Sequence, residues 1–174
     1  MTQMHTTAVP ASDELVRTRS RFWSDTNAAI LHASLEPDSV AEGQEHEPPV
    51  AQFIHDQLEQ MECCRAISLL TPGNTSLTEF DVLVVIVTPT GFRSLFADLR
   101  VAVTSSVPIL PVFYDPQNSP LDVSALRDGA PTDVFEIIFD QEIMMLRWDF
   151  EWERAAFVSE LAKRLYLLSS ASVQ

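Results

Sequence analysis

The pattern of apolar and polar positions along the chain predicts short buried strands alternating with amphipathic helices. Apolar runs without periodic polar breaks are typical of strands that are buried on both faces. Such runs cover residues 28–33, 66–70, 81–87 and 108–114. The third run continues Val-Leu-Val-Val-Ile-Val after its first residue, Asp81. We therefore expect it at or near the centre of a parallel sheet.

A fifth strand is expected late in the chain, although the pattern leaves its boundaries open. Apolar residues gather in two neighbouring segments, 135–139 and 142–147, and both are candidates for it. The fourth run contains Pro108 and Pro111. Proline has no backbone N–H to donate, so these residues favour a strand start or a sheet edge over a central ladder.

Apolar residues at helical spacing predict three helices. One follows Pro48 and Pro49 and covers about 50–61, a second covers 92–103, and the last carries an apolar stripe from Phe150 to Leu168. The link 71–80, with its Pro-Gly pair, is too short for a full helix, and 121–133 is expected to be a loop with at most a short helix.

The order of these elements predicts an α/β fold, a flavodoxin-like three-layer sandwich. A five-stranded parallel sheet is expected, with helices on both faces. Residues 26–168 would form this single domain. Residues 1–25 are expected to be an N-terminal tail with a short helix, and residues 169–174 a C-terminal tail.

Composition and charge narrow the classes of function. The chain has 174 residues and a hydrophobic fraction of 46%, enough for a sizeable core, but no apolar stretch long enough to span a membrane. No secretory signal is expected, and the adjacent Cys63 and Cys64 exclude a disulfide framework, so a cytoplasmic location is predicted. The net charge of -14 argues against binding to nucleic acid or to anionic membranes.

Four segments together suggest a family. The first is Ile-Leu-His-Ala-Ser at 30–34 with acidic residues after it, and the second is the apolar run 81–89 that begins with Asp and ends in Thr-Pro. Ser-Leu-Phe-Ala-Asp-Leu-Arg at 94–100 and Pro-Ile-Leu-Pro-Val-Phe-Tyr-Asp at 108–115 complete the set. In this order and spacing, and with the aromatic closing helix, the chain resembles the TIR (Toll/interleukin-1 receptor) domain family.

This resemblance implies a signalling module that assembles through protein–protein contacts, with itself or with other TIR-like domains. It also implies NAD as a substrate, because enzymatic members cleave the nicotinamide–ribose bond with a Glu carboxylate. Asp98 takes the place of that Glu, and His32, Ser34 and Glu36 would line the NAD site. A carboxylate there stabilises the cationic ribose of the transition state.

Two departures from the family pattern affect this expectation. The segment that ends at Asp98 is about two residues short, and Asp is one methylene shorter than Glu. A displacement of about 1 Å is enough to lower a rate by orders of magnitude, so the chain is expected to be catalytically impaired. The short link 71–80 also leaves no room for a helix that TIR assemblies often use. An NAD glycohydrolase that uses Asp98 is the alternative function.

Plainer interpretations of the same residues stay open. Asp98 could be a solvated helix residue and His32 a packing residue. Trp148, Phe150 and Trp152 could be a core edge or a docking surface. No metal site is expected at His46 and His55, because suitably spaced ligands are missing. A receiver domain is disfavoured, and a nucleoside deoxyribosyltransferase is a remote option.

Overall fold

A computed structural model describes residues 26–33, 50–62, 64–73, 77–115, 120–147 and 150–171. The strands are β1 Asn27–His32, β2 Ala66–Leu70, β3 Val82–Val87, β4 Ile109–Tyr114 and β5 Met144–Leu146. The α-helices are α2 Val50–Gln60, α3 Phe96–Thr104, α4 Val123–Arg127, α5 Thr132–Phe139 and α6 Glu151–Ala171. Two 3₁₀ helices are η2 Leu77–Glu79 and η3 Phe92–Leu95.

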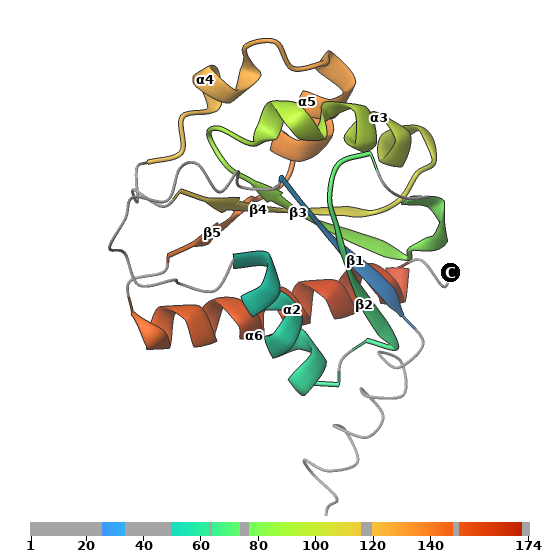
Figure 1. Cartoon of the computed structure of the whole chain (residues 1–174), viewed down its shortest axis with the longest axis vertical. Coiled ribbons are helices and arrows are strands. Elements are labelled where there is room, and N and C mark those ends of the chain that lie inside the picture. The colour runs from blue at the N-terminus through green and yellow to red at the C-terminus, as the bar shows by residue number, and fades with distance from the viewer. Residues whose placement is uncertain are drawn as a thin grey trace, which may run out of the picture.

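The five strands form one parallel sheet in the order β2-β1-β3-β4-β5 (Figure 1). This is the strand order of flavodoxin-like folds, which confirms the predicted fold class. β3 occupies the centre, and all six of its residues are buried, as its uninterrupted apolar run predicted. A helix covers each face of such a sheet because every crossover between parallel strands must return over one face.

The core consists of two apolar layers, one on each face of the sheet. Alternate residues of β3 point to opposite faces, so Val84 packs with α2 and α6 while Val85 packs with α3 and α5. Figure 1 shows the same division, with α2 and α6 below the sheet and α3, α4 and α5 above it. No helix in the described part of the chain combines the length and apolar character needed to cross a membrane.

The proline-containing strand β4 is not at an edge, and this part of the expectation was wrong. β4 lies between β3 and β5, and Pro111 is aligned with Val85 of the central strand. Both prolines are accommodated without a break, because the first precedes the strand and the second sits where no donor is needed.

The direction of the backbone groups explains how Pro111 fits. In a parallel ladder, both backbone groups of a residue point to one neighbour, and those of the next residue point to the other. The carbonyl of Pro108 accepts the N–H of Leu83 at 2.9 Å, so position 108 faces β3 and position 111 faces β5. Pairing with β5 begins only at Val112, opposite Met144. The missing N–H of Pro111 therefore falls just before that ladder starts.

The segment 135–139 is helical, so its interpretation as a strand was wrong. It belongs to α5, in which Val134 and Ile138 are buried while Asp133 and Glu136 are exposed. That spacing of four residues is helical, but the apolar Phe135, Ile137 and Phe139 hide it in the sequence. The fifth strand is β5, which lies within the other candidate segment, 142–147.

Several boundaries agree with the sequence and two differ. β2 and η3–α3 lie where they were expected, and the β2–β3 link contains in its described part only the three-residue η2. α6 continues to Ala171, so the first three residues of the expected C-terminal tail are helical. Phe150, expected on the apolar stripe of that helix, is exposed. The expected tail and short helix before residue 26 lie outside the described residues.

Candidate functional site

The carboxyl ends of β1 and β3 form the first candidate site, because ligands of open α/β sheets bind where the strand order reverses. β1 ends in His32 and Ala33, and a turn from Thr88 to Gly91 follows β3. The Gly91 N–H donates to Thr88 Oγ1 at 2.9 Å. A Cβ on Gly91 would lie 2.7 Å from the Ala33 Cβ, so the two chain segments touch and position 91 requires glycine.

His32 is the one described residue of the three expected to hold NAD. Its side chain is half-buried, and its Nδ1 lies 3.4 Å from the Ala33 carbonyl, at the long limit of a hydrogen bond. Ser34 and Glu36 lie outside the described residues. The predicted NAD site is therefore represented here by its histidine and by the β1 strand end alone.

Asp98 contacts a neighbouring turn. It lies in the first turn of α3, half-buried, where a carboxylate interacts favourably with the positive end of the helix dipole. Its two oxygens accept the N–H of Gly73 at 3.2 and 3.4 Å, in the turn after β2. Within the described residues, no hydrogen bond or ion pair joins Asp98 to His32. The carboxylate thus links α3 to the turn that follows the edge strand β2.

A groove between the edge strand β5 and helix α6 is the second candidate site. Its volume is about 400 Å³. The floor is apolar, the rim is charged, and the residues that line it are Glu142, Ile143, Met144, Met145, Arg147, Trp152, Glu153, Ala156, Phe157, Glu160 and Arg164. Arg164 crosses this rim, since its guanidinium contacts a Glu142 Oε at 3.4 Å and a Glu160 Oε at 3.3 Å.

Two aromatic side chains at the start of α6 extend the groove onto the surface. Phe150 and Trp152 are 56% and 68% exposed, and their rings stack with centroids 6.1 Å apart. Phe157, five residues beyond Trp152 on α6, is buried in the core. The interpretation as a core edge is wrong for Phe150 and Trp152, whereas Trp148 lies outside the described residues.

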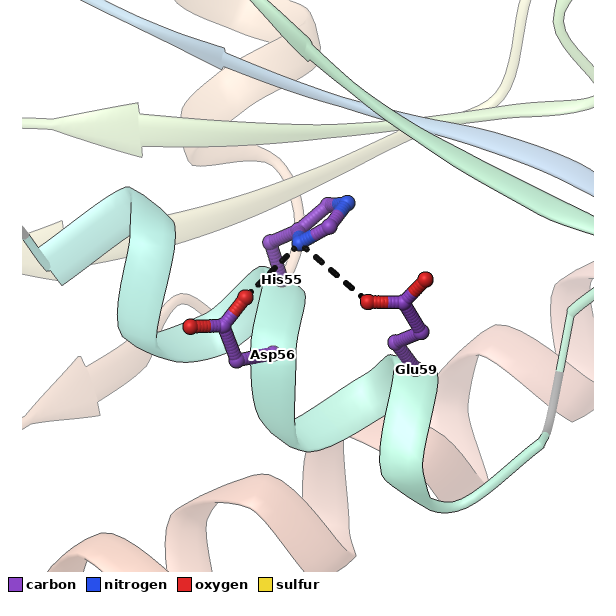
Figure 2. Close-up of side chains that lie close together, drawn as sticks. All are labelled: His55, Asp56 and Glu59. Carbon is purple, nitrogen blue, oxygen red and sulfur yellow. Dashed lines mark hydrogen bonds and ion pairs between the residues drawn. The ribbon is translucent and has the colours of Figure 1, made fainter.

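A third cluster lies on helix α2, which contacts β2, the strand at the opposite edge of the sheet from β5. Figure 2 shows His55, Asp56 and Glu59 with the imidazole between the two carboxylates. His55 Nδ1 is 3.1 Å from Asp56 Oδ1 and 4.0 Å from Glu59 Oε2. The hydrogen bonds that Asp56 makes with His55 and Gln52 lower the pKa of its carboxyl. The sequence interpretation that His55 lacks a carboxylate set was wrong.

Sequence signals for these features existed but were weak. His55 and Glu59 are four residues apart, which puts them on the same helix face. The alternation of aromatics before α6 pointed to the exposed pair without deciding between core and surface. Nothing local indicated that Asp98 would meet Gly73, since the contact joins residues 25 positions apart.

Comparisons with known proteins do not identify the function of any of these sites. No protein-family model and no curated protein matches the chain. Among solved structures, it is similar to the sugar isomerase domain of an RpiR transcription factor from Sphaerobacter thermophilus. That similarity has 14% sequence identity and a TM-score of 0.45, over 92% of this chain and 84% of that chain. A likeness this distant says nothing about activity.

Proposed function

We propose that the protein is a TIR-like assembly module that binds protein domains, copies of itself included, through the β5–α6 groove and the aromatic pair Phe150–Trp152. The observation that carries the proposal is the exposure of these two stacked rings beside an apolar groove. The resemblance to TIR domains, which act through such contacts, supports the same function.

The chemistry of this surface suits an interface. Trp and Arg are among the residues that most often dominate the binding energy of an interface, and Phe is enriched in interfaces. Burying a fully exposed Phe side chain stabilises a complex by about 1.5–3 kcal/mol before ordering costs are subtracted. The charged rim around Arg164 and its two glutamates would keep water from the apolar centre. Large side chains already stacked on each other also lose less freedom on binding.

The position of the groove at the sheet edge adds a second mode of contact. β5 is an edge strand of three residues, so its outer backbone groups face away from the sheet. An exposed edge strand can pair with an extended segment of another chain, and three residues offer a short ladder for it. Met145, which is exposed in the middle of β5, lies beside the groove and would contact that segment.

The alternative function, cleavage of NAD by Asp98, has a weaker basis. Asp98 sits near the carboxyl edge of the sheet, where such a site would form. Its carboxylate, however, is engaged with the Gly73 N–H. To bind ribose hydroxyls, the carboxylate would have to give up its hydrogen bond with the Gly73 N–H. This supports a positioning role in the fold rather than efficient catalysis.

Self-association tests the proposed function. Sedimentation velocity over a concentration series should show reversible association of the parent at moderate salt, and Trp152→Ala should weaken it at least about tenfold, as expected for an aromatic anchor. Leu167→Ala is the matched control, because Leu167 is exposed on the same helix but does not line the groove. A monomer at every concentration, or equal effects of the two substitutions, would contradict self-association through this surface.

Release of nicotinamide from NAD tests the alternative function. The purified protein should show little or none, since the carboxylate of Asp98 is shorter than the family Glu and tied to the turn after β2. Asp98→Ala provides the comparison. Robust turnover that disappears in this variant would establish the glycohydrolase in place of an impaired module. Turnover that survives it would remove Asp98 from the chemistry altogether.

A further inference from the structure

Both ring nitrogens of His55 lie close to oxygen atoms of neighbouring groups. The Nε2 atom lies 3.1 Å from the backbone carbonyl oxygen of Ile67, on strand β2. A carbonyl oxygen can only accept, so Nε2 carries the proton and donates it. In a neutral ring the other nitrogen, Nδ1, then presents a lone pair.

That lone pair faces two more acceptors. Nδ1 is 3.1 Å from Asp56 Oδ1 and 4.0 Å from Glu59 Oε2, as the dashed lines in Figure 2 show. Three electron-pair donors, one ring nitrogen and two carboxylate oxygens, thus converge on one place, which is the arrangement of a metal-binding site.

We propose that His55, Asp56 and Glu59 form a binding site for a divalent transition-metal ion of the zinc class, on the exposed side of helix α2. One imidazole nitrogen and two carboxylate oxygens suit Zn²⁺, Co²⁺ or Ni²⁺, whereas Mg²⁺ and Ca²⁺ prefer oxygen ligands alone. The site is independent of the proposed docking surface, since neither α2 nor β2 lines the groove.

The distances fit such an ion after a small movement. With bonds of 2.0–2.2 Å, neighbouring ligands of tetrahedral zinc are about 3.3 Å apart. The Nδ1–Oδ1 pair is already at this separation, and all three ligand atoms lie within 4.8 Å of one another. Glu59 has to approach the other two ligands by about 0.7–1.5 Å to reach the same separation. Its side chain is 72% exposed and can rotate to do so.

Two neighbours hold the ligands in place. The Ile67 carbonyl fixes the orientation and the tautomer of His55, the role that a carbonyl behind a metal-binding histidine ordinarily performs. Gln52 donates from Nε2 to Asp56 Oδ1 at 2.8 Å, which orients that carboxylate. Three protein ligands leave a coordination position for water or an outside group. Because Ile67 belongs to β2, a bound ion would also fasten α2 to this edge strand.

Isothermal titration with ZnCl₂ tests the site, with MgCl₂ as the comparison ion and Co²⁺ absorption as a second readout. One ion should bind per chain. His55→Gln keeps an amide donor for the Ile67 carbonyl but removes the ring nitrogen, and we expect it to weaken Zn²⁺ binding by about tenfold or more. Glu59→Gln should weaken binding as well. His32→Ala and Glu62→Gln, outside the cluster, are the matched controls.

The opposite results would overturn the proposal. Absence of saturable Zn²⁺ binding at millimolar concentration would show that the three side chains do not form a metal site. Zn²⁺ affinity that is unchanged in His55→Gln, or lost equally in His32→Ala, would place the metal elsewhere on the chain. None of these outcomes bears on self-association, which is measured separately with Trp152→Ala.

Discussion

At the scale of single residues, the carboxyl edge of the sheet depends on two glycines with different requirements. Gly73 has a φ of 85°, a conformation that L side chains rarely adopt, but no atom lies within 4 Å of where its Cβ would be. Gly91 has an ordinary φ of -97°, but a Cβ at this position would have no room. The first glycine is needed for its backbone, and the second for the close approach of β1 to the turn after β3.

Substitution of these glycines should separate the two requirements. Gly91→Ala brings a methyl group against Ala33 and Thr88 Oγ1, and overpacking of this kind costs about 1–3 kcal/mol in the free energy of unfolding. Gly73→Asn should cost less than about 1 kcal/mol, because Asn tolerates positive φ and has room there. Urea denaturation of both variants measures the difference. Equal costs would mean that the contact at Gly91 relaxes freely.

At the scale of elements, α5 shows why an apolar run alone does not distinguish a helix from a strand. Ile137 and Ile138 are neighbours in the sequence, yet Ile137 is 42% exposed and Ile138 is fully buried. Ile138 packs in the layer between the sheet and the helices above it. In a strand with one buried face, Phe135, Ile137 and Phe139 would share that face.

A charge placed at each isoleucine tests the helix. Ile138→Glu would bury an unpaired carboxylate and should lower the free energy of unfolding by about 3 kcal/mol or more. Ile137→Glu should change it by only about 0.5 kcal/mol, the usual range for a surface substitution. Thermal melts followed by circular dichroism provide the comparison. The reverse order of effects would restore the strand interpretation of 135–139.

At the scale of the whole molecule, the net charge of -14 opposes any contact between two copies. Like charges meet across a symmetric interface, and dissolved salt at 0.1 M screens their repulsion only beyond a Debye length of about 10 Å. The docking surface must therefore bind against long-range repulsion when the partner is another copy. A basic partner would gain from the same field.

The salt dependence of association should consequently identify the kind of partner. Self-association should strengthen as the salt concentration rises from about 0.02 to 0.5 M, because screening removes the repulsion. Binding of a basic partner should weaken over the same series. Sedimentation at each salt concentration measures the first case directly. Self-association that weakens with added salt would mean that local charge pairs, such as those around Arg164, outweigh the net charge.

The sequence by itself determined the elements whose burial is uniform or strictly periodic. The run 82–87 is short, consists only of Val, Leu and Ile, and is followed by Thr-Pro, which together favour a buried strand near the centre of a parallel sheet. The helical stripe after residue 50 predicted α2 equally well. In both segments the local pattern and the tertiary environment favour the same secondary structure, so the sequence pattern is enough to predict it.

Only the tertiary structure decided the rest, because the deciding contacts join residues far apart in the chain. The fit of Pro111 depends on where pairing with β5 begins, and the exposure of Trp152 depends on which surface α6 presents to the sheet. His55 is oriented by a carbonyl twelve residues away, and Asp98 by an N–H twenty-five residues away. Tertiary packing brings such partners together, and the local spacing of apolar residues carries no information about them.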